Sequence, residues 1–145
     1  MTARTYLSQS LRLNQRINSK LEQIQSLREL ATKCTPFLTG MPKSPNQGSS
    51  VMADAVIKIV NLEAELQQDT DRLVDLKKEI MTVIKAVDNY ECQTLLELRY
   101  LCFKSWEQIA VDMGYNVRHV YRLHDEARLK VRVPQKQQYM SLYVM

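Results

Sequence analysis

The chain has 145 residues, enough for one ordinary domain or for a small globular module joined to an elongated element. Apolar residues make up 45% of it and charged residues 25%, a composition that suits a folded protein and excludes a wholly disordered one. Twenty Lys and Arg residues outnumber sixteen Asp and Glu residues, so the formal charge of +4 at pH 7 favours anionic partners without deciding between them.

The charge is distributed unevenly, because residues 1–50 and 91–145 carry a basic excess and residues 51–90 an acidic one. The three cysteines show no short C-x-x-C spacing, and no signal-like apolar segment lies at the start, which favours reduced thiols and a cytoplasmic location. Charged or polar residues interrupt every hydrophobic stretch before it reaches the roughly 18 residues that a membrane span requires. We therefore expect no membrane-embedded segment.

The first element that we expect is a long amphipathic helix from about Tyr6 to Cys34. Apolar side chains recur there at steps of three or four residues, which is the spacing of one seam along a helix. Residues 35–50 then hold three of the four prolines and two of the three glycines, a composition typical of a linker. The seam residues of the first helix are Leu13, Ile17, Leu21, Ile24, Leu27, Ala31 and Cys34.

The second expected element is a longer helix over residues 52–87, in which steps of three and four residues continue over five heptads. Such a helix would be about 55 Å long at 1.5 Å per residue, so its seam must pack against another helix. The partner is either the basic first helix of the same chain, folded back as an antiparallel hairpin, or a second copy of the protein. The seam residues are Met52, Ala55, Ile59, Leu62, Leu66, Asp69, Leu73, Leu76, Ile80, Val83 and Val87.

Asp69 is the polar residue in that seam, and it has two interpretations. A buried aspartate would select the register or the partner of the helix pair at some cost in stability. Alternatively, the seam drifts locally and Asp69 is solvated beside Thr70.

Two short helices joined by a tight turn are expected next. Ser105 and Gln108 fit the capping box S-x-x-Q, which starts a helix at Trp106. Gly114 ends that helix, because glycine adopts the left-handed backbone conformation without a Cβ clash. Asn116 is then a good N-cap for the second helix.

Each of these helices has one apolar face, and a small residue at position 110 lets them cross closely, as in a helix-turn-helix. The apolar run Thr94–Leu101 supplies a preceding helix, and Trp106 fills the core from the other side. The expected fold is all-α: a helical oligomerisation region over residues 1–90, a self-sufficient helix-turn-helix domain over residues 91–133, and an apolar tail over residues 134–145. The inner faces consist of Ile109, Ala110, Met113, Val117, Val120, Leu123 and Ala127.

A DNA-binding helix-turn-helix places its second helix in the major groove, with the outward-facing residues of the first turns at base edges. Those positions are occupied by Arg118, His119, Tyr121 and Arg122. Arginine can contact guanine O6 and N7 together, whereas tyrosine, histidine and the pair Lys104 and Ser105 suit phosphates. The same spacing also occurs in helical domains that never touch DNA.

The segment SWEQIAVDMGYNVRHVYRLHDEARLKV resembles the helix-turn-helix of bacterial sigma factor region 4 in its small residue, its turn glycine and its V-x-R-x-x-x-x-A rhythm. The segments ELATKCTPFLTGMP, AVIKIVNLEAEL, DRLVDLKKEI and LLELRYLCFKSWEQIAVDMGY are similar to phage and prophage proteins of Gram-positive bacteria. Those proteins are in turn similar to the RinA and ArpU-type regulators of phage late genes. The resemblance covers nearly the whole chain and is most specific at the C-terminal motif.

This resemblance implies a transcription regulator in the bacterial host cell whose recognition helix, Val117 to Val131, reads a promoter element in double-stranded DNA. Val117 departs from the polar residue common in region 4, so the sequence that is read would differ. We expect a homo-oligomer, with a dimer favoured, and host RNA polymerase would be a further partner. The candidate DNA-binding residues are Lys104, Ser105, Asn116, Val117, Arg118, His119, Tyr121 and Arg122.

Two other functions remain open: a phage small terminase subunit that recognises a packaging site, and a helical protein-interaction module without DNA binding. No enzyme is expected, because the chain lacks a phosphate-cradling glycine loop, a nucleophile elbow and paired carboxylates. Neither a metal nor a cofactor is expected. His119 and His124 diverge by about 140° on a helix, and the cysteines suit small core positions.

Overall fold

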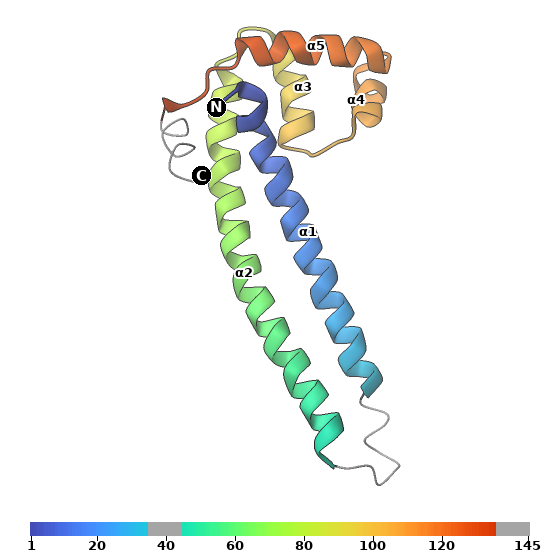
Figure 1. Ribbon diagram of the computed structural model, residues 1–145. Helices are drawn as coiled ribbons and strands as arrows, with labels where there is room; N and C mark the ends of the chain where they lie inside the picture. Colours follow the sequence, from blue (N-terminus) through green and yellow to red (C-terminus); the bar gives the residue numbers. More distant parts are fainter. Residues whose placement is uncertain (35–44, 136–145) are drawn as a thin grey trace. The chain divides into compact units, whose positions relative to one another are not determined.

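The computed structural model describes residues 1–34 and 45–135, and every regular element within these ranges is a helix (Figure 1). The expected all-α fold is therefore confirmed for this part of the chain. The apolar tail from residue 136 and most of the expected linker lie outside the described residues. The helices are α1 (Ala3–Cys34), α2 (Pro45–Lys85), α3 (Tyr90–Tyr100), α4 (Trp106–Met113) and α5 (Val117–Lys130).

Helix α2 begins earlier than the sequence suggests, inside the segment expected to be a linker. It starts at Pro45, whereas the apolar seam starts only at Met52. A proline is tolerated in the first turn of a helix, because the backbone N–H that it lacks would have no partner within the helix there. The proline at position 45 therefore marks the start of α2 and not the middle of a linker.

The chain divides into two compact units. The bundle unit comprises Met1–Leu13 with Leu73–Met145, and the hairpin unit comprises Asn14–Arg72. The expected boundary near residue 90 does not coincide with this division, because the start of α1 and the end of α2 are packed with α3, α4 and α5 in the bundle unit.

In the hairpin unit, α1 and α2 run antiparallel within the one chain. Arg28 pairs with Glu63 at 2.8 Å, whereas Lys20, which lies earlier in α1, pairs with Asp69, which lies later in α2. All eleven predicted seam positions of the second helix are buried or half-buried, which confirms the seam, although α2 ends at Lys85 and Val87 lies just beyond it. Among the α1 seam positions from Leu13 to Ala31, Leu21 is the exposed one, with 48% of its surface accessible, and the side chain of Cys34 lies outside the described part.

Asp69 is buried in the hairpin unit, with 5% of its surface exposed. It pairs with Lys20, and Glu65 lies 3.6 Å from the same ammonium group. The alternative in which Asp69 is solvated is therefore wrong. The basic partner across the seam stabilises its charge, and a buried ion pair of this kind suits one alignment of two helices better than others.

The bundle unit has one continuous hydrophobic core to which α1 and α2 contribute as well as α3, α4 and α5. The Ser10 hydroxyl of α1 lies 2.9 Å from the carbonyl oxygen of Tyr100 in α3, and the Tyr6 hydroxyl donates to Glu79 of α2 at 2.9 Å. The core residues are Tyr6, Leu7, Ile80, Ile84, Val87, Cys92, Leu95, Leu96, Tyr100, Ile109, Ala110, Val120, Leu123 and Ala127. Residues 91–133 therefore share their core with both long helices, contrary to the expectation of a self-sufficient domain.

Candidate functional site

Helix α4 begins where the capping pattern predicted. The Ser105 hydroxyl accepts a hydrogen bond from the backbone N–H of Gln108 at 3.2 Å, so Ser105 is the N-cap. Among the described residues the Gln108 side chain does not complete the capping box, and its amide nitrogen donates a hydrogen bond to Asp112 Oδ1 at 2.8 Å.

Gly114 forms the tight turn between α4 and α5. Its φ of +71° lies in the left-handed region, and the Tyr115 N–H donates to the Ala110 carbonyl at 2.9 Å, which closes the C-terminus of α4. A Cβ at position 114 would meet no atom within 4 Å. The requirement for glycine therefore comes from the backbone angle and not from a lack of space.

Helix α5 starts at the predicted N-cap and packs through the predicted face. The Asn116 side chain accepts a hydrogen bond from the His119 N–H at 2.7 Å. Val120, Leu123 and Ala127 are buried, and Ala110 of α4 lies in the same core. The helix ends at Lys130, so the expected last residue, Val131, is its C-cap.

The outward-facing side of α5 exposes two of the predicted arginines. Arg118 and Arg122 are both exposed, and neither takes part in a hydrogen bond or ion pair among the described residues. Tyr121 lies between them with 47% of its surface exposed. Its ring meets the Trp106 ring edge-on at a centroid distance of 5.5 Å. The first two turns of α5 therefore present two cations without a carboxylate partner.

The other predicted residues surround this surface but are more constrained. Asn116 and Ser105 are exposed, and their side-chain oxygens cap the two helices. Val117 is half-buried against the core. His119 is half-buried, and its ring lies 4.3 Å from the Tyr115 ring.

Lys104 differs most from its expected role, because it is paired within the protein. Its ammonium group lies 2.5 Å from Asp112. This hydrogen bond raises the pKa of Lys104 and lowers the pKa of Asp112. Any anion that binds Lys104 must therefore compete with a carboxylate that the sequence analysis did not weigh.

A buried polar pair beneath α5 was missed by the sequence analysis. The Tyr100 hydroxyl and His124 Nε2 lie 2.7 Å apart in a hydrogen bond that joins α3 to α5. Burial lowers the pKa of His124 to about 4, so the imidazole is neutral at pH 7. The sequence does contain one signal for this pair. His124 lies beside Leu123 and one turn after Val120, on the apolar side of the helix.

Trp106 connects this pair to the surface. Its ring lies 4.8 Å from the His124 ring, and the Arg99 guanidinium sits 4.4 Å from the centre of the Trp106 ring. Arg99 also donates a hydrogen bond from Nη1 to the Lys104 carbonyl at 2.9 Å. An arginine of α3 is thus held beside the start of α4, where the sequence analysis had considered only Lys104 and Ser105.

The cysteines and histidines are dispersed. Cys92 is buried as expected, but Cys102 is exposed, because it lies in the α3–α4 loop and not on a packed face. Within residues 1–34 and 45–135, no group of three or more His, Cys, Asp and Glu side chains is arranged to hold a metal ion.

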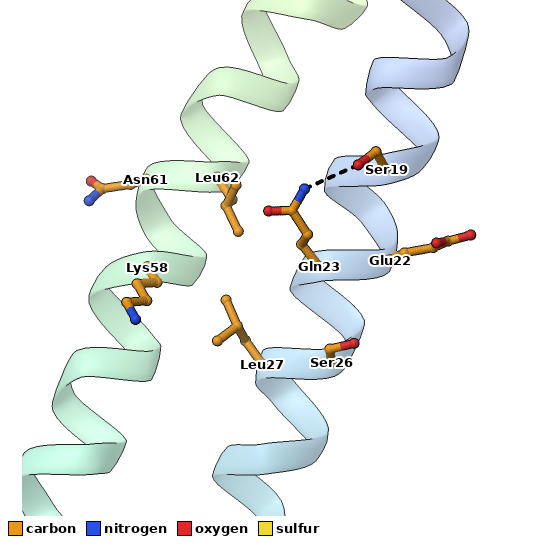
Figure 2. A pocket seen from close by; sticks show the side chains of 8 residues that line it. All are labelled: Ser19, Glu22, Gln23, Ser26, Leu27, Lys58, Asn61 and Leu62. Atoms are coloured by element: carbon orange, nitrogen blue, oxygen red, sulfur yellow. Dashed lines mark hydrogen bonds between the residues drawn. The ribbon is translucent and has the colours of Figure 1, made fainter.

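An open hollow lies between α1 and α2 in the hairpin unit (Figure 2). Leu27 and Leu62 lie between the two helices, and the Gln23 amide donates to the Ser19 hydroxyl at 3.2 Å. The hollow has two charged lining residues, Glu22 and Lys58.

The fold and the site define an all-helical protein in which a helix, a tight turn and a second helix expose two arginines on one surface. A family model described as "Protein of unknown function (DUF1492)" matches residues 46–132, and the chain belongs to this family. The comparisons with curated proteins and with solved structures give no match. Among the described helices, none is long and apolar enough to span a membrane.

Proposed function

We propose that this protein is a sequence-specific DNA-binding regulator of transcription, of phage or prophage origin, that binds promoter DNA through α4 and α5. The observation that carries the proposal is the exposure of Arg118 and Arg122 on the first two turns of α5, without a carboxylate partner among the described residues. Exposed arginines without an acidic partner create a positive surface potential, which favours binding of an external polyanion.

In this proposal α5 enters the major groove with its N-terminal turns at the base edges. Arg118 and Arg122 have the planar donor fork that matches guanine O6 and N7. Val117 lies at the start of the same helix and would contact a thymine methyl group, and Tyr121 would contact the sugar–phosphate backbone. Gly114 and Ala110 support this function indirectly, because they set how α5 crosses α4.

The first experiment identifies the DNA target. The purified protein is incubated with fragments of its own phage or prophage genome, and the retained fragments are sequenced. Retention of a promoter region upstream of late genes supports the proposal. Retention of a packaging site would favour the small terminase subunit, and no salt-sensitive retention of any fragment would favour a module for protein contacts.

The second experiment tests the two arginines on the duplex that is found. We expect Arg118→Ala and Arg122→Ala each to weaken specific binding by about 1–3 kcal/mol if each loses a base contact. Fluorescence anisotropy with the specific duplex measures this loss. Arg72→Ala, in the hairpin unit, removes an equally exposed arginine and should leave affinity unchanged. Wild-type affinity in both α5 variants, with the helical content intact, would remove them from the interface.

The proposal includes association of two copies, for which the hairpin unit offers an apolar surface. Val56, Ile57 and Val60 of α2 lie outside the seam and are 51%, 57% and 58% exposed. Sedimentation equilibrium measures the assembly. A dimer suits a regulator that reads paired half-sites, whereas a ring of eight or more subunits would favour the terminase function. Host RNA polymerase is the protein partner that the proposed regulator would have on its promoter.

A further inference from the structure

Three arginines from three different helices carry charges that act on the buried Tyr100–His124 pair of the bundle unit. Arg99 of α3 directly precedes Tyr100, Arg128 of α5 follows His124 by one turn, and Arg4 lies in the first turn of α1. The positive charges of all three act on both the Tyr100 hydroxyl and the His124 imidazole. We call Arg4, Arg99 and Arg128 the flanking arginines, because their charges act on this pair from both sides of it in the chain and from α1.

The flanking arginines have few partners for a group with five N–H donors. Arg99 makes one hydrogen bond, to the Lys104 carbonyl, and Arg4 makes none among the described residues. Arg128 lies 3.4 Å from Asp125 without hydrogen-bond geometry. The Nε atoms of Arg99 and Arg128 are buried and have no hydrogen-bond partner. The described protein therefore leaves most of these guanidinium donors unused.

The charges near this pair also leave the flanking arginines without sufficient acidic partners. Asp125 is the carboxylate whose charge acts on His124, and its side chain is 67% exposed to solvent. The His124 imidazole is neutral, so it neither adds to the cluster nor compensates it. The charges that act on His124 are thus three arginines and one solvated carboxylate, and Arg4 and the 41% exposed Arg128 are accessible to a ligand.

The cluster continues onto the surface of α5. Arg99 lies against one part of the Trp106 ring, and Tyr121 meets another part of the same ring. Stacking on an aromatic ring restricts the guanidinium of Arg99 before any ligand arrives. Arg99 is thus joined through the Trp106 ring to the tyrosine that lies between Arg118 and Arg122 on α5.

We propose that the flanking arginines bind the sugar–phosphate backbone of the duplex whose major groove α5 enters. The inference rests on the proposed function and adds to it a second set of contacts, made by α1, α3 and the last turns of α5. Arginine forks match phosphate oxygens, and such contacts orient a protein on DNA without reading its sequence. The start of α1 is therefore part of the DNA-binding surface, although no helix-turn-helix pattern includes it.

The experiment measures the salt dependence of binding for Arg4→Gln and Arg128→Gln. Arg99 is left in place, because its stacking and its hydrogen bond also support the α3–α4 loop. Affinity is measured at NaCl concentrations from about 0.05 to about 0.3 M, both for the specific duplex and for a scrambled duplex of equal length. Each lost phosphate contact should make the slope of log affinity against log salt shallower by about 0.9. It should also lower affinity for both duplexes by the same factor, about fivefold at 0.15 M salt.

Arg72→Gln is the matched control, because it removes an exposed arginine of the hairpin unit and should keep the wild-type slope. Circular dichroism shows whether each variant is folded, and Arg4→Gln alters an exposed side chain, so it tests the inference even if Arg128→Gln unfolds. Wild-type slopes in the folded variants, alongside loss of specific binding in Arg118→Ala, would overturn this inference alone. A wild-type protein that binds neither duplex would overturn the proposed function together with it.

Discussion

Among single residues, His124 shows most clearly what local sequence patterns can and cannot predict. Helical spacing predicted that His119 and His124 point in different directions, and in the structure one ring lies against Tyr115 and the other lies in the core. Spacing did not predict which histidine is buried. That depends on the Tyr100 hydroxyl, which belongs to another helix and supplies the hydrogen bond that a buried imidazole requires.

The depressed pKa of His124 predicts that acid destabilises the protein. The unfolded chain takes up a proton near pH 6.5, whereas folded His124 takes one up only near pH 4. Stability from this group is therefore complete above about pH 6.5 and is lost as the pH falls toward 4. Between pH 7.5 and pH 5 the loss should be about 2 kcal/mol, measured by urea unfolding.

His124→Gln keeps a hydrogen-bond acceptor for Tyr100 but cannot be protonated in this range. Its stability should therefore vary less over the same pH interval than that of the wild type. His119→Gln, which changes the other histidine of α5, is the control and should retain the wild-type dependence. Equal pH dependence in wild type and His124→Gln would show that another group is responsible.

The residues at the ends of α4 and α5 were predicted correctly because their signals are local. Ser105 and Asn116 cap helices through backbone groups three residues away, and Gly114 is required by its own φ. Lys104 was less predictable, because its partner Asp112 lies eight residues further along the chain. Whether these residues contact DNA remains a prediction.

At the scale of helices, the hydrophobic period predicted both seams but not the pairing across them. The period places side chains on one face, whereas the residue opposite Asp69 depends on how far α1 is shifted along α2. The structure aligns Lys20 with Asp69, so the polar residue in the α2 seam has a basic partner from α1. Leu21 differs from the prediction in the other direction. Its spacing places it in the α1 seam, but its side chain remains exposed.

The Lys20–Asp69 pair predicts strong non-additivity in stability. Asp69→Ala should cost about 3 kcal/mol, because it leaves the mostly buried ammonium of Lys20 with only Glu65 nearby. The double variant Lys20→Met with Asp69→Leu should recover most of this loss, because it replaces both charges by apolar groups of similar size. Chemical unfolding of the wild type, both single variants and the double variant measures the coupling. Additive effects would contradict a specific buried pair.

For the whole molecule, the sequence was sufficient to predict an all-helical chain but not its division into units. The change in hydrophobic pattern suggested a boundary near residue 90. Tyr6 and Leu7, however, lie in the same core as Val120 and Leu123. No periodicity within α1 distinguishes its first turns, which enter the bundle core, from its later turns, which pair with α2. Contacts between residues so distant in sequence are not visible in local patterns.

The shared core predicts that residues 86–135 do not fold alone, although they contain the whole of α3, α4 and α5. This fragment lacks Tyr6, Leu7, Ile80 and Ile84, all of them fully buried in the bundle unit. Small domains are marginally stable, and each missing large apolar side chain costs about 2–5 kcal/mol. Circular dichroism of the fragment during urea titration should show little helix and no cooperative transition, in contrast to the full chain. A sharp transition would show that the three helices suffice.

The contribution of α1 to the bundle core has a consequence for synthesis on the ribosome. Tyr6 and Leu7 are translated among the first residues, but their core neighbours Val120 and Leu123 follow only after α2, α3 and α4. Until then the nascent chain carries these two apolar side chains without their final neighbours, as is common for proteins whose core joins distant segments. A messenger RNA truncated before α5 would therefore yield a product with exposed apolar side chains. Proteases and chaperones would bind this product, and it would not be a smaller functional protein.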